Sequence, residues 1–201
     1  MADILIIGCG VIGAATAFYL SRYDLDIVVA EKENDVSMGT SRANSAIIHA
    51  GYDPEPGTLA AKLNVEGSKL AEFLAPELSV PYIRNGSLVL AFDEEDEKTL
   101  LRLKNNAEKN GVEGVRILSK EELREKEPNV SPDAISALYA PTGAIINPWE
   151  YTLALAEVAV KNGVKLERNT EVSGIEKETD GYIVKTNKGE IKTKYIINCA
   201  G

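Results

Sequence analysis

The chain has 201 residues, of which 22 are Lys or Arg and 31 are Asp or Glu, so its formal net charge is −9. This length suits one large or two small globular domains, and the absence of a Lys/Arg cluster argues against a nucleic-acid surface. No apolar run approaches the ~20 residues of a membrane span, and the N-terminus begins directly with a strand-like segment, so we expect a cytoplasmic protein.

The N-terminal segment has the layout of a dinucleotide-binding βαβ unit. An apolar run, Ile4–Ile7, enters the turn Gly8-x-Gly10-x-x-Gly13, and a helix-forming segment, Val11–Tyr19, leaves it. Gly8 permits the tight turn, Gly10 lets a pyrophosphate approach bare backbone, and Gly13 lets the helix pack against the strand. The helix N-terminus then offers free N–H groups and a positive dipole end to phosphates.

A second buried run, Ile27–Ala30, ends at Glu31, which stands 18 residues after Gly13. A carboxylate at this place can accept both hydroxyls of an adenosine ribose and would repel a 2′-phosphate, so FAD or NAD is favoured over NADP. Glycine turns alone are weak evidence, because glycines also occur in ordinary turns. The ordered combination of strand, helix, second strand and acid makes a nucleotide site the better interpretation.

The following loop, residues 33–51, is rich in Gly, Ser, Thr and Asn and ends near His49, the single histidine of the chain. Composition alone favours a solvated connection. Its position after the acid favours ligand contacts, because ligands bind at the carboxyl ends of strands in such sheets.

The runs Gly39-Thr40-Ser41-Arg42-Ala43-Asn44-Ser45 and Ile48-His49-Ala50-Gly51, together with the glycine turn, resemble FAD-dependent oxidoreductases of the D-amino acid oxidase superfamily. The nearest branches are FAD-dependent glycerol-3-phosphate dehydrogenase and L-2-hydroxyglutarate dehydrogenase, and the resemblance extends over all 201 residues. It implies that Thr40 to Ser45 contact the FAD diphosphate and flavin, and that His49 lies near the isoalloxazine ring. Aerobic respiratory glycerol-3-phosphate dehydrogenases have Gly-Gly-x-Arg after that histidine, whereas this chain has Ala50-Gly51-Tyr52-Asp53-Pro54 and lacks the arginine expected to hold a phosphate.

A mixture of helices and strands then interrupts the doubly wound pattern. The spacing predicts a helix over Thr58–Leu74, ended by Pro76, whose residues Leu59, Leu63, Leu70, Phe73 and Leu74 pack in the core. Strands around Asn85-Gly86, a helix Asp93–Asn110 stopped by Gly111, a capping box starting at Ser119 and a strand Ile135–Ala140 follow. Arg84 could reach a substrate anion, although an exposed arginine beside a turn is the more ordinary interpretation.

The C-terminal part returns to the nucleotide-binding pattern. Asn147-Pro148-Trp149-Glu150 opens a helix, and 164–167 is predicted to be the third parallel strand. Short strands over 172–176, 182–186 and 191–194 precede an apolar end at 195–201. The resemblance implies a backbone contact of Val172 with adenine and an approach of the last residues to the cofactor. Cys9 and Cys199, at the ends of neighbouring strands, are read as reduced thiols, with a disulfide as the alternative; two cysteines are too few for a zinc site, and no metal is expected.

We therefore predict an α/β fold: a Rossmann-like FAD-binding domain of the glutathione-reductase type (1–75 and 146–201) with an inserted α+β part of a substrate domain (76–145). The predicted cofactor-binding residues are Gly8, Gly10, Val11, Ile12, Gly13, Glu31, Lys32, Thr40, Ser41, Asn44, Ser45, Val172, Ala200 and Gly201. His49 is the predicted catalytic base, with a purely positional role as the alternative.

The resemblance also implies that the chain is the N-terminal, C-terminally truncated part of an enzyme, inactive by itself, with exposed apolar surface that favours self-association. The predicted reaction of the parent enzyme is oxidation of glycerol 3-phosphate, with hydride transfer to flavin N5. L-2-hydroxyglutarate or a related 2-hydroxy acid is the second candidate substrate, and an amine or amino acid the third. A non-catalytic nucleotide-binding module is the alternative from another class, and the sequence leaves the electron acceptor open.

Overall fold

The computed structural model describes residues 1–201, which form two compact units. One unit comprises Met1–Ser45, Leu78–Val80 and Asn147–Gly201, and the other comprises Ala46–Glu77 and Pro81–Ile146. Residues 46–75 thus belong to the second unit, whereas the sequence assigned them to the FAD-binding domain. The division into functional domains stays a prediction.

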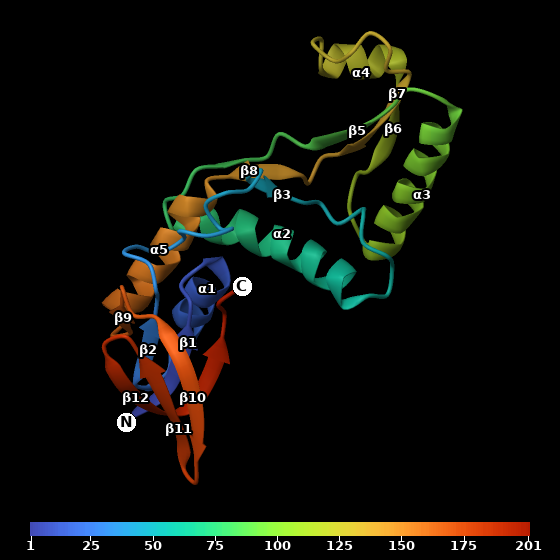
Figure 1. Ribbon diagram of the computed structural model, residues 1–201. Coiled ribbons are helices and arrows are strands. Elements are labelled where there is room, and N and C mark those ends of the chain that lie inside the picture. The colour runs from blue at the N-terminus through green and yellow to red at the C-terminus, as the bar shows by residue number, and fades with distance from the viewer. The chain divides into compact units, whose positions relative to one another are not determined.

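A six-stranded sheet with the strand order β10-β11-β12-β1-β2-β9 forms the first unit (Figure 1). Its strands are β1 (Ala2–Ile7), β2 (Ile27–Ala30), β9 (Lys165–Glu167), β10 (Val172–Glu178), β11 (Gly181–Thr186) and β12 (Gly189–Asn198). Strands β12, β1, β2 and β9 run parallel, while β10, β11 and β12 form an antiparallel meander. The predicted Rossmann-like α/β fold and its third parallel strand are confirmed.

Strand β12 is longer than predicted. Its first half pairs with β11 and its second half with β1, so the strand expected at 191–194 continues without a break into the apolar segment expected at 195–201 and ends at Asn198. This long strand joins the meander to the parallel sheet and brings Cys199 to the end of β1, where its N–H donates to the carbonyl of Ile7 at 2.8 Å.

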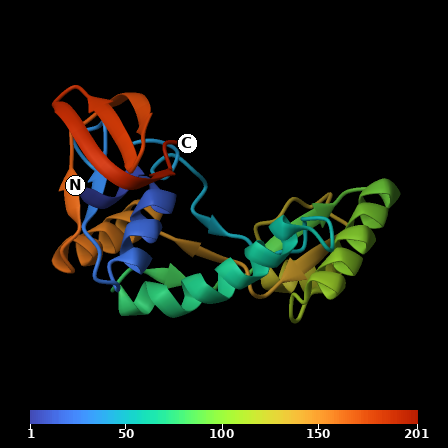
Figure 2. The same ribbon diagram turned by 90° about the horizontal axis from the view of Figure 1, so that it is seen from below.

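The helices α1 (Val11–Leu20) and α5 (Pro148–Lys161) of this unit lie side by side (Figure 2). Asn147 caps α5 as predicted, because its side-chain oxygen accepts from the N–H groups of Trp149 and Glu150, both at 3.2 Å. Leu5, Val28 and Val184 lie in the core of this unit. Full burial of an aliphatic side chain contributes about 1.5–3 kcal/mol, so these strands hold the segments that follow them in fixed positions.

The second unit contains two three-stranded sheets. One has the order β3-β8-β4 and the other β5-β7-β6. Their strands are β3 (Ile47–Ile48), β4 (Tyr82–Ile83), β5 (Ser87–Ala91), β6 (Arg116–Ser119), β7 (Ser136–Ala140) and β8 (Ala144–Ile146). The strands that flank Asn85-Gly86 belong to different sheets, and the N–H of Gly86 donates to the carbonyl of Gly143 at 2.8 Å.

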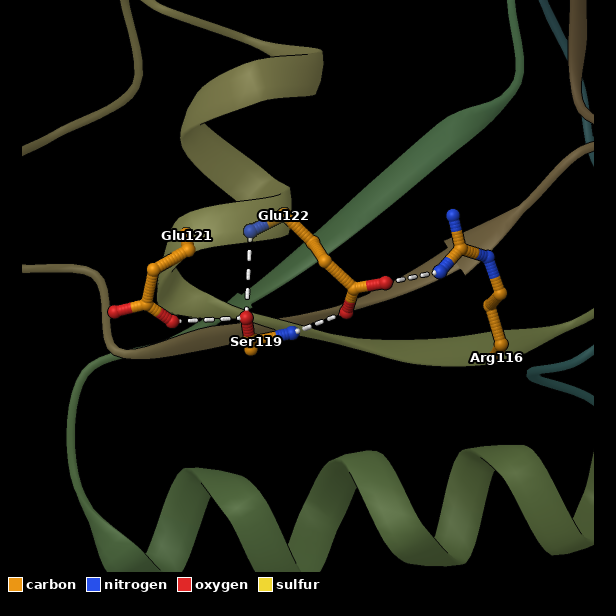
Figure 3. Close-up of polar contacts among 4 residues, drawn as sticks. All are labelled: Arg116, Ser119, Glu121 and Glu122. Atoms are coloured by element: carbon orange, nitrogen blue, oxygen red, sulfur yellow. Dashed lines mark hydrogen bonds and ion pairs between the residues drawn. The ribbon is translucent and has the colours of Figure 1, made fainter.

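Two of the helix starts predicted in this unit, at Asp93 and Ser119, are confirmed by their caps. Asp93 caps α3 (Glu94–Asn110) by accepting from Glu95 and Asp96, and Gly111, with φ 76°, ends the helix. Ser119 and Glu122 form the capping box of α4 (Lys120–Lys126), as Figure 3 shows. The Ser119 N–H donates to Glu122 Oε2 at 2.9 Å, and the Glu122 N–H donates to Ser119 Oγ at 3.3 Å.

Helix α2 (Leu59–Glu77) differs from its prediction. Its buried residues are Ala61, Ser68, Ala71, Leu74 and Ala75. Leu59, Leu63, Leu70 and Phe73 are 68%, 53%, 44% and 66% exposed, so the predicted core role is wrong for these four residues and holds for Leu74. The apolar spacing marks a stripe, but the side that packs is the one with small residues. Pro76 lies inside the helix, which ends one residue later.

No helix combines the length and the apolar character that crossing a membrane requires.

Candidate nucleotide-binding site

A cavity of about 610 Å³ lies in the first unit, where the carboxyl ends of β1, β2 and β12 meet the start of α1. Its wall is formed by Ile7, Gly8, Gly10, Val11, Ile12, Ala30, Glu31, Lys32, Glu33, Met38, Gly39, Thr40, Ser41, Asn44, Thr170, Glu171, Val172, Cys199, Ala200 and Gly201. Parallel strands bring their carboxyl ends to one edge of the sheet, so segments far apart in sequence meet at one ligand site.

The glycine turn leaves no room for side chains. Gly8 has φ +92°, and a Cβ atom there would lie 2.7 Å from the carbonyl oxygen of Cys199. A Cβ atom at Gly13 would lie 2.0 Å from the carbonyl oxygen of Gly8. Such contacts are far inside van der Waals distance, so these two glycines allow the helix, the turn and β12 to pack closely.

Glu31 lies at the end of β2 and is only 7% exposed. Its Oε2 accepts the N–H of Cys9 at 2.6 Å, and its Oε1 accepts the N–H of Glu33 at 2.9 Å. These bonds to the charged form stabilise a buried carboxylate. Each oxygen keeps a lone pair that could accept a ribose hydroxyl.

The Cys9 thiol next to this carboxylate stays protonated. Burial, and next the negative charges of Glu31 and Asp35, raise the pKa of Cys9 to about 12. Only the thiolate is a strong nucleophile or metal ligand, so Cys9 serves packing rather than chemistry. Both cysteines are free, as the reading from sequence favoured.

The loop after Glu31 folds back onto the start of α1. The N–H of Val11, the first residue of α1, donates to Ser41 Oγ at 2.8 Å. Asn44 fixes the loop, because its amide donates to the carbonyls of Thr40 at 3.0 Å and Ser41 at 3.1 Å. The Ser41 hydroxyl, while it accepts from α1, still has its own proton to donate toward an anion at the helix N-terminus.

Thr170, Glu171 and Val172, which follow β9 in the chain, also line the cavity. The N–H of Thr170 donates to the carbonyl of Glu31 at 2.8 Å, and the N–H of Glu31 donates to the carbonyl of Glu167 at 2.9 Å. These bonds join the segment after β9 to the end of β2.

Most of the predicted cofactor residues meet at this cavity. Gly8, Gly10, Val11, Ile12, Glu31, Lys32, Thr40, Ser41, Asn44, Val172, Ala200 and Gly201 line it. Gly13 lies beneath the turn, and Ser45 is not on the wall. Glu33, Met38, Thr170 and Glu171 also line the cavity but were not predicted, because they lie close in the chain to predicted residues and have no motif of their own.

His49 lies in the second unit, exposed at a small cavity of about 190 Å³. Gly51, Tyr52, Asp53, Pro54 and Asn64 complete the wall of that cavity. Asn110 clamps the loop, since its amide donates to the carbonyls of Gly51 and Pro54, both at 2.9 Å. The wall carries no Lys or Arg, so it offers no cation for a phosphate.

Arg84, which the sequence suggested could reach a substrate anion, is paired with other groups of the protein. Its Nη1 lies 2.6 Å from Glu72 Oε1, and its Nε donates to the carbonyl of Pro141 at 3.2 Å. These partners favour the ordinary interpretation of Arg84 as a surface arginine.

The cavity of the first unit fits the adenosine diphosphate half of a dinucleotide. It combines bare glycine backbone, a helix N-terminus with a hydroxyl beside it, and a buried carboxylate. The glycine backbone and the helix N-terminus suit phosphate groups, and the carboxylate suits ribose hydroxyls.

The parallel sheet, the glycine turn and Glu31 are together typical of dinucleotide-binding proteins, and they place the chain in that class. The model of the FAD dependent oxidoreductase family matches residues 3–201, and the chain belongs to that family. The resemblance inferred from sequence, and FAD as its cofactor, are thereby confirmed.

Within this family, the chain is similar to proteins with two named substrates. The chain is 54% identical over 201 residues to glycerol 3-phosphate dehydrogenase of Caloramator mitchellensis, covering 100% of the chain and 42% of the relative. It is 34% identical to the mitochondrial L-2-hydroxyglutarate dehydrogenase of Mus musculus, covering 97% of the chain and 45% of the relative. The dithionite-reduced L-alpha-glycerophosphate oxidase of Mycoplasma pneumoniae with FAD bound superposes with a TM-score of 0.93 at 39% identity, covering 100% of the chain and 54% of that structure. The chain spans about half the length of the relatives that it matches.

Proposed function

We propose that the chain belongs to an FAD-dependent dehydrogenase that oxidises the secondary alcohol of glycerol 3-phosphate. The 54% identity to a glycerol 3-phosphate dehydrogenase over the whole chain is the observation that carries the proposal. FAD, when bound, supplies the hydride acceptor, while the protein supplies orientation and proton transfer.

In this proposal the cavity of the first unit holds the adenosine diphosphate part of FAD. Glu31 accepts the ribose hydroxyls, and the N-terminus of α1, with the Ser41 hydroxyl beside it, binds the diphosphate. Val172 contacts the adenine through its backbone, and Thr40, Asn44, Ala200 and Gly201 complete the wall. Gly13 does not contact the cofactor in this proposal. It supports the site by packing against the backbone of Gly8.

His49 is proposed as the base that takes the hydroxyl proton of the substrate. An imidazole titrates near neutrality and suits this role, and a positional role is the alternative. Since the cavity beside His49 has no cation, the substrate phosphate would be bound by residues other than those of that wall.

The test uses the natural polypeptide loaded with FAD under anaerobic conditions. Glycerol 3-phosphate is expected to bleach the flavin absorbance, and a His49→Asn variant should slow this reduction by ~10²-fold or more. An unchanged rate would remove His49 as the base. Bleaching by another compound but not by glycerol 3-phosphate would overturn the substrate.

L-2-hydroxyglutarate is the second candidate substrate, because the mouse dehydrogenase named for it matches 97% of the chain. The same bleaching assay separates the two compounds. A protein that binds NAD loosely and no FAD would instead support the non-catalytic nucleotide-binding module.

We also propose self-association, since the second unit exposes large apolar side chains on α2. The cytoplasmic location expected from the sequence stays a prediction.

A further inference from the structure

The segment that carries His49, the proposed base, is held on both sides within the second unit. Before His49, strand β3 pairs with β8 as far as Ile48. After it, Ala50 is only 2% exposed and packs in a hydrophobic core with Leu100 and Ala107 of α3. The backbone of His49 is therefore restrained by the residues next to it, although its own side chain is exposed.

Asn110, the last residue of α3, holds the loop that follows Ala50. Its side-chain amide donates to the carbonyl oxygens of Gly51 and Pro54, both at 2.9 Å. A primary amide has two N–H hydrogens, so this contact uses its full donor capacity. The two bonds join the loop after His49 to the end of a helix more than fifty residues further along the chain.

Gly51 confines the loop from another direction. It has φ +105°, and a Cβ atom there would lie 2.6 Å from Cγ2 of Val65 on α2. A left-handed conformation of this kind favours glycine. The Gly51 backbone thus packs against α2 while its carbonyl oxygen accepts from Asn110 at the end of α3.

The type of residue at position 110 matters because both of its partners are carbonyl oxygens. An aspartate has the shape of asparagine but no N–H, so it would set a negatively charged oxygen against the carbonyls of Gly51 and Pro54. A serine has a single O–H donor and could satisfy only one of them. The amide of Asn110 therefore suits the two acceptors, and its loss would release the loop.

We propose that Asn110 is a positioning residue for His49. By holding the loop at Gly51 and Pro54, it keeps the imidazole at the place from which it takes the hydroxyl proton of the substrate, so the inference rests on the proposed role of His49. Asn110 does not line the small cavity beside His49, and its effect is therefore indirect. A shift of a catalytic group by about 1 Å, caused by a remote change, can slow a reaction by ~10²-fold.

Anaerobic reduction of the flavin in the natural, FAD-loaded polypeptide tests the proposal. The substrate is glycerol 3-phosphate or L-2-hydroxyglutarate, whichever bleaches the unmodified protein. At saturating substrate, Asn110→Asp should lower the rate constant of flavin reduction by roughly 10-fold or more, with an unchanged FAD content. Asn110→Ser keeps one donor and should lower this rate constant by about 3-fold.

Asn105→Asp is the matched control. Asn105 is exposed on α3, so this variant adds the same charge to the same helix without touching the loop, and it should react at the unmodified rate. Circular dichroism confirms that each variant is folded. If Asn110→Asp does not fold, Asn110→Ser carries the test.

A double variant shows whether Asn110 acts through His49. His49→Asn removes the imidazole, so adding Asn110→Asp or Asn110→Ser to it should slow the reduction by less than about 2-fold more. Losses that multiply in the double variant would mean general damage and would overturn the proposal. Equal losses in Asn105→Asp and Asn110→Asp would overturn it as well.

The single variants separate this inference from the proposed function. If His49→Asn is slow while the folded Asn110 variants react at the unmodified rate, the positioning role alone is wrong. If neither compound bleaches the flavin, or if His49→Asn reacts at the unmodified rate, the proposed role of His49 is wrong and the positioning role is overturned with it.

Discussion

The buried carboxylate of Glu31 accepts a hydrogen bond from the backbone N–H of Cys9 at 2.6 Å. The acid after β2 is thereby tied to the middle of the glycine turn after β1. Its other oxygen accepts from the N–H of Glu33 at 2.9 Å, so both oxygens have fixed positions before any ligand arrives. The proposed ribose acceptor and diphosphate turn thus form one preorganised site, which lowers the entropic cost of binding.

Replacement of this acid should weaken FAD binding. Glu31→Ala removes the ribose acceptor and leaves the Cys9 N–H without its partner, so the affinity for FAD should fall by at least about 10-fold and the melting temperature should fall as well. Isothermal titration with FAD and thermal unfolding measure the two effects. Glu157→Gln is the control, since Glu157 is exposed on α5 and does not line the cavity. Equal losses in both variants would contradict the role of Glu31.

Two glycines in helices should respond in opposite directions to alanine. Gly13→Ala places a Cβ atom 2.0 Å from the carbonyl oxygen of Gly8 and should destabilise the fold by about 3 kcal/mol. Gly67→Ala in α2 meets nothing within 4 Å and should stabilise the fold by about 0.5–1 kcal/mol, because alanine has the smaller entropy cost in a helix. Urea unfolding of both variants measures the difference. A tolerated Gly13→Ala would contradict the close packing of turn and helix.

Within the loop Thr40–Ser45, Ser41 should contribute to binding of the FAD diphosphate and Ser45 should not. Ser41→Ala removes the acceptor of the Val11 N–H and the proposed phosphate donor, so FAD affinity should fall by about 5–10-fold. Ser45→Ala should have no effect, because Ser45 is not on the cavity wall, although the sequence placed it there. Titration with ADP, which lacks the flavin, should show the same order. A larger loss for Ser45→Ala would restore the prediction from sequence.

The nucleotide site was predictable because its signals are local. Strand, glycine turn, helix and Glu31 follow one another along the chain, and the caps Asn147 and Asp93 act on N–H groups two or three residues away. Of the wall segment after β9, the sequence named Val172 through the family resemblance but not Thr170, whose backbone bond to the carbonyl of Glu31 leaves no mark in the side-chain pattern.

Other features depend on partners remote in sequence. Strands β3 and β8 have two and three residues, and they exist because Ile47 pairs with Ile145 across the sheet. The packing of α2 is a similar case, since the helical spacing of Leu63 and Leu70 predicts a stripe but not which neighbour covers it. The periodicity of a sequence predicts which residues share a face of a helix, whereas tertiary packing determines which of the faces is buried.

The capping box of α4 should be sensitive to acid. The Ser119 N–H, and next the Arg116 guanidinium at 2.7 Å, hold the pKa of Glu122 below its ordinary value of 4.5 (Figure 3). Because the folded pKa lies below the unfolded one, the stabilisation is present above about pH 4.5 and is lost as the pH falls through the lower folded value. Hydrogen exchange of the α4 amides should therefore accelerate in that range, while a Glu122→Gln variant should show less of this change. Identical acid profiles would contradict the assignment.

The two cysteines should differ in reactivity and in their effect at alkaline pH. The pKa of Cys9 is raised by burial to about 12 from an ordinary 9.0, whereas Cys199 lines the cavity. A thiol reagent should therefore modify one thiol in the folded protein and two after denaturation. Above pH 9 the unfolded chain loses the Cys9 proton while the folded chain keeps it, so stability should fall as the pH rises from 9 toward 12. Cys9→Ala should flatten this slope and Cys199→Ala should keep it. Rapid modification of both thiols in the folded protein would contradict the burial of Cys9.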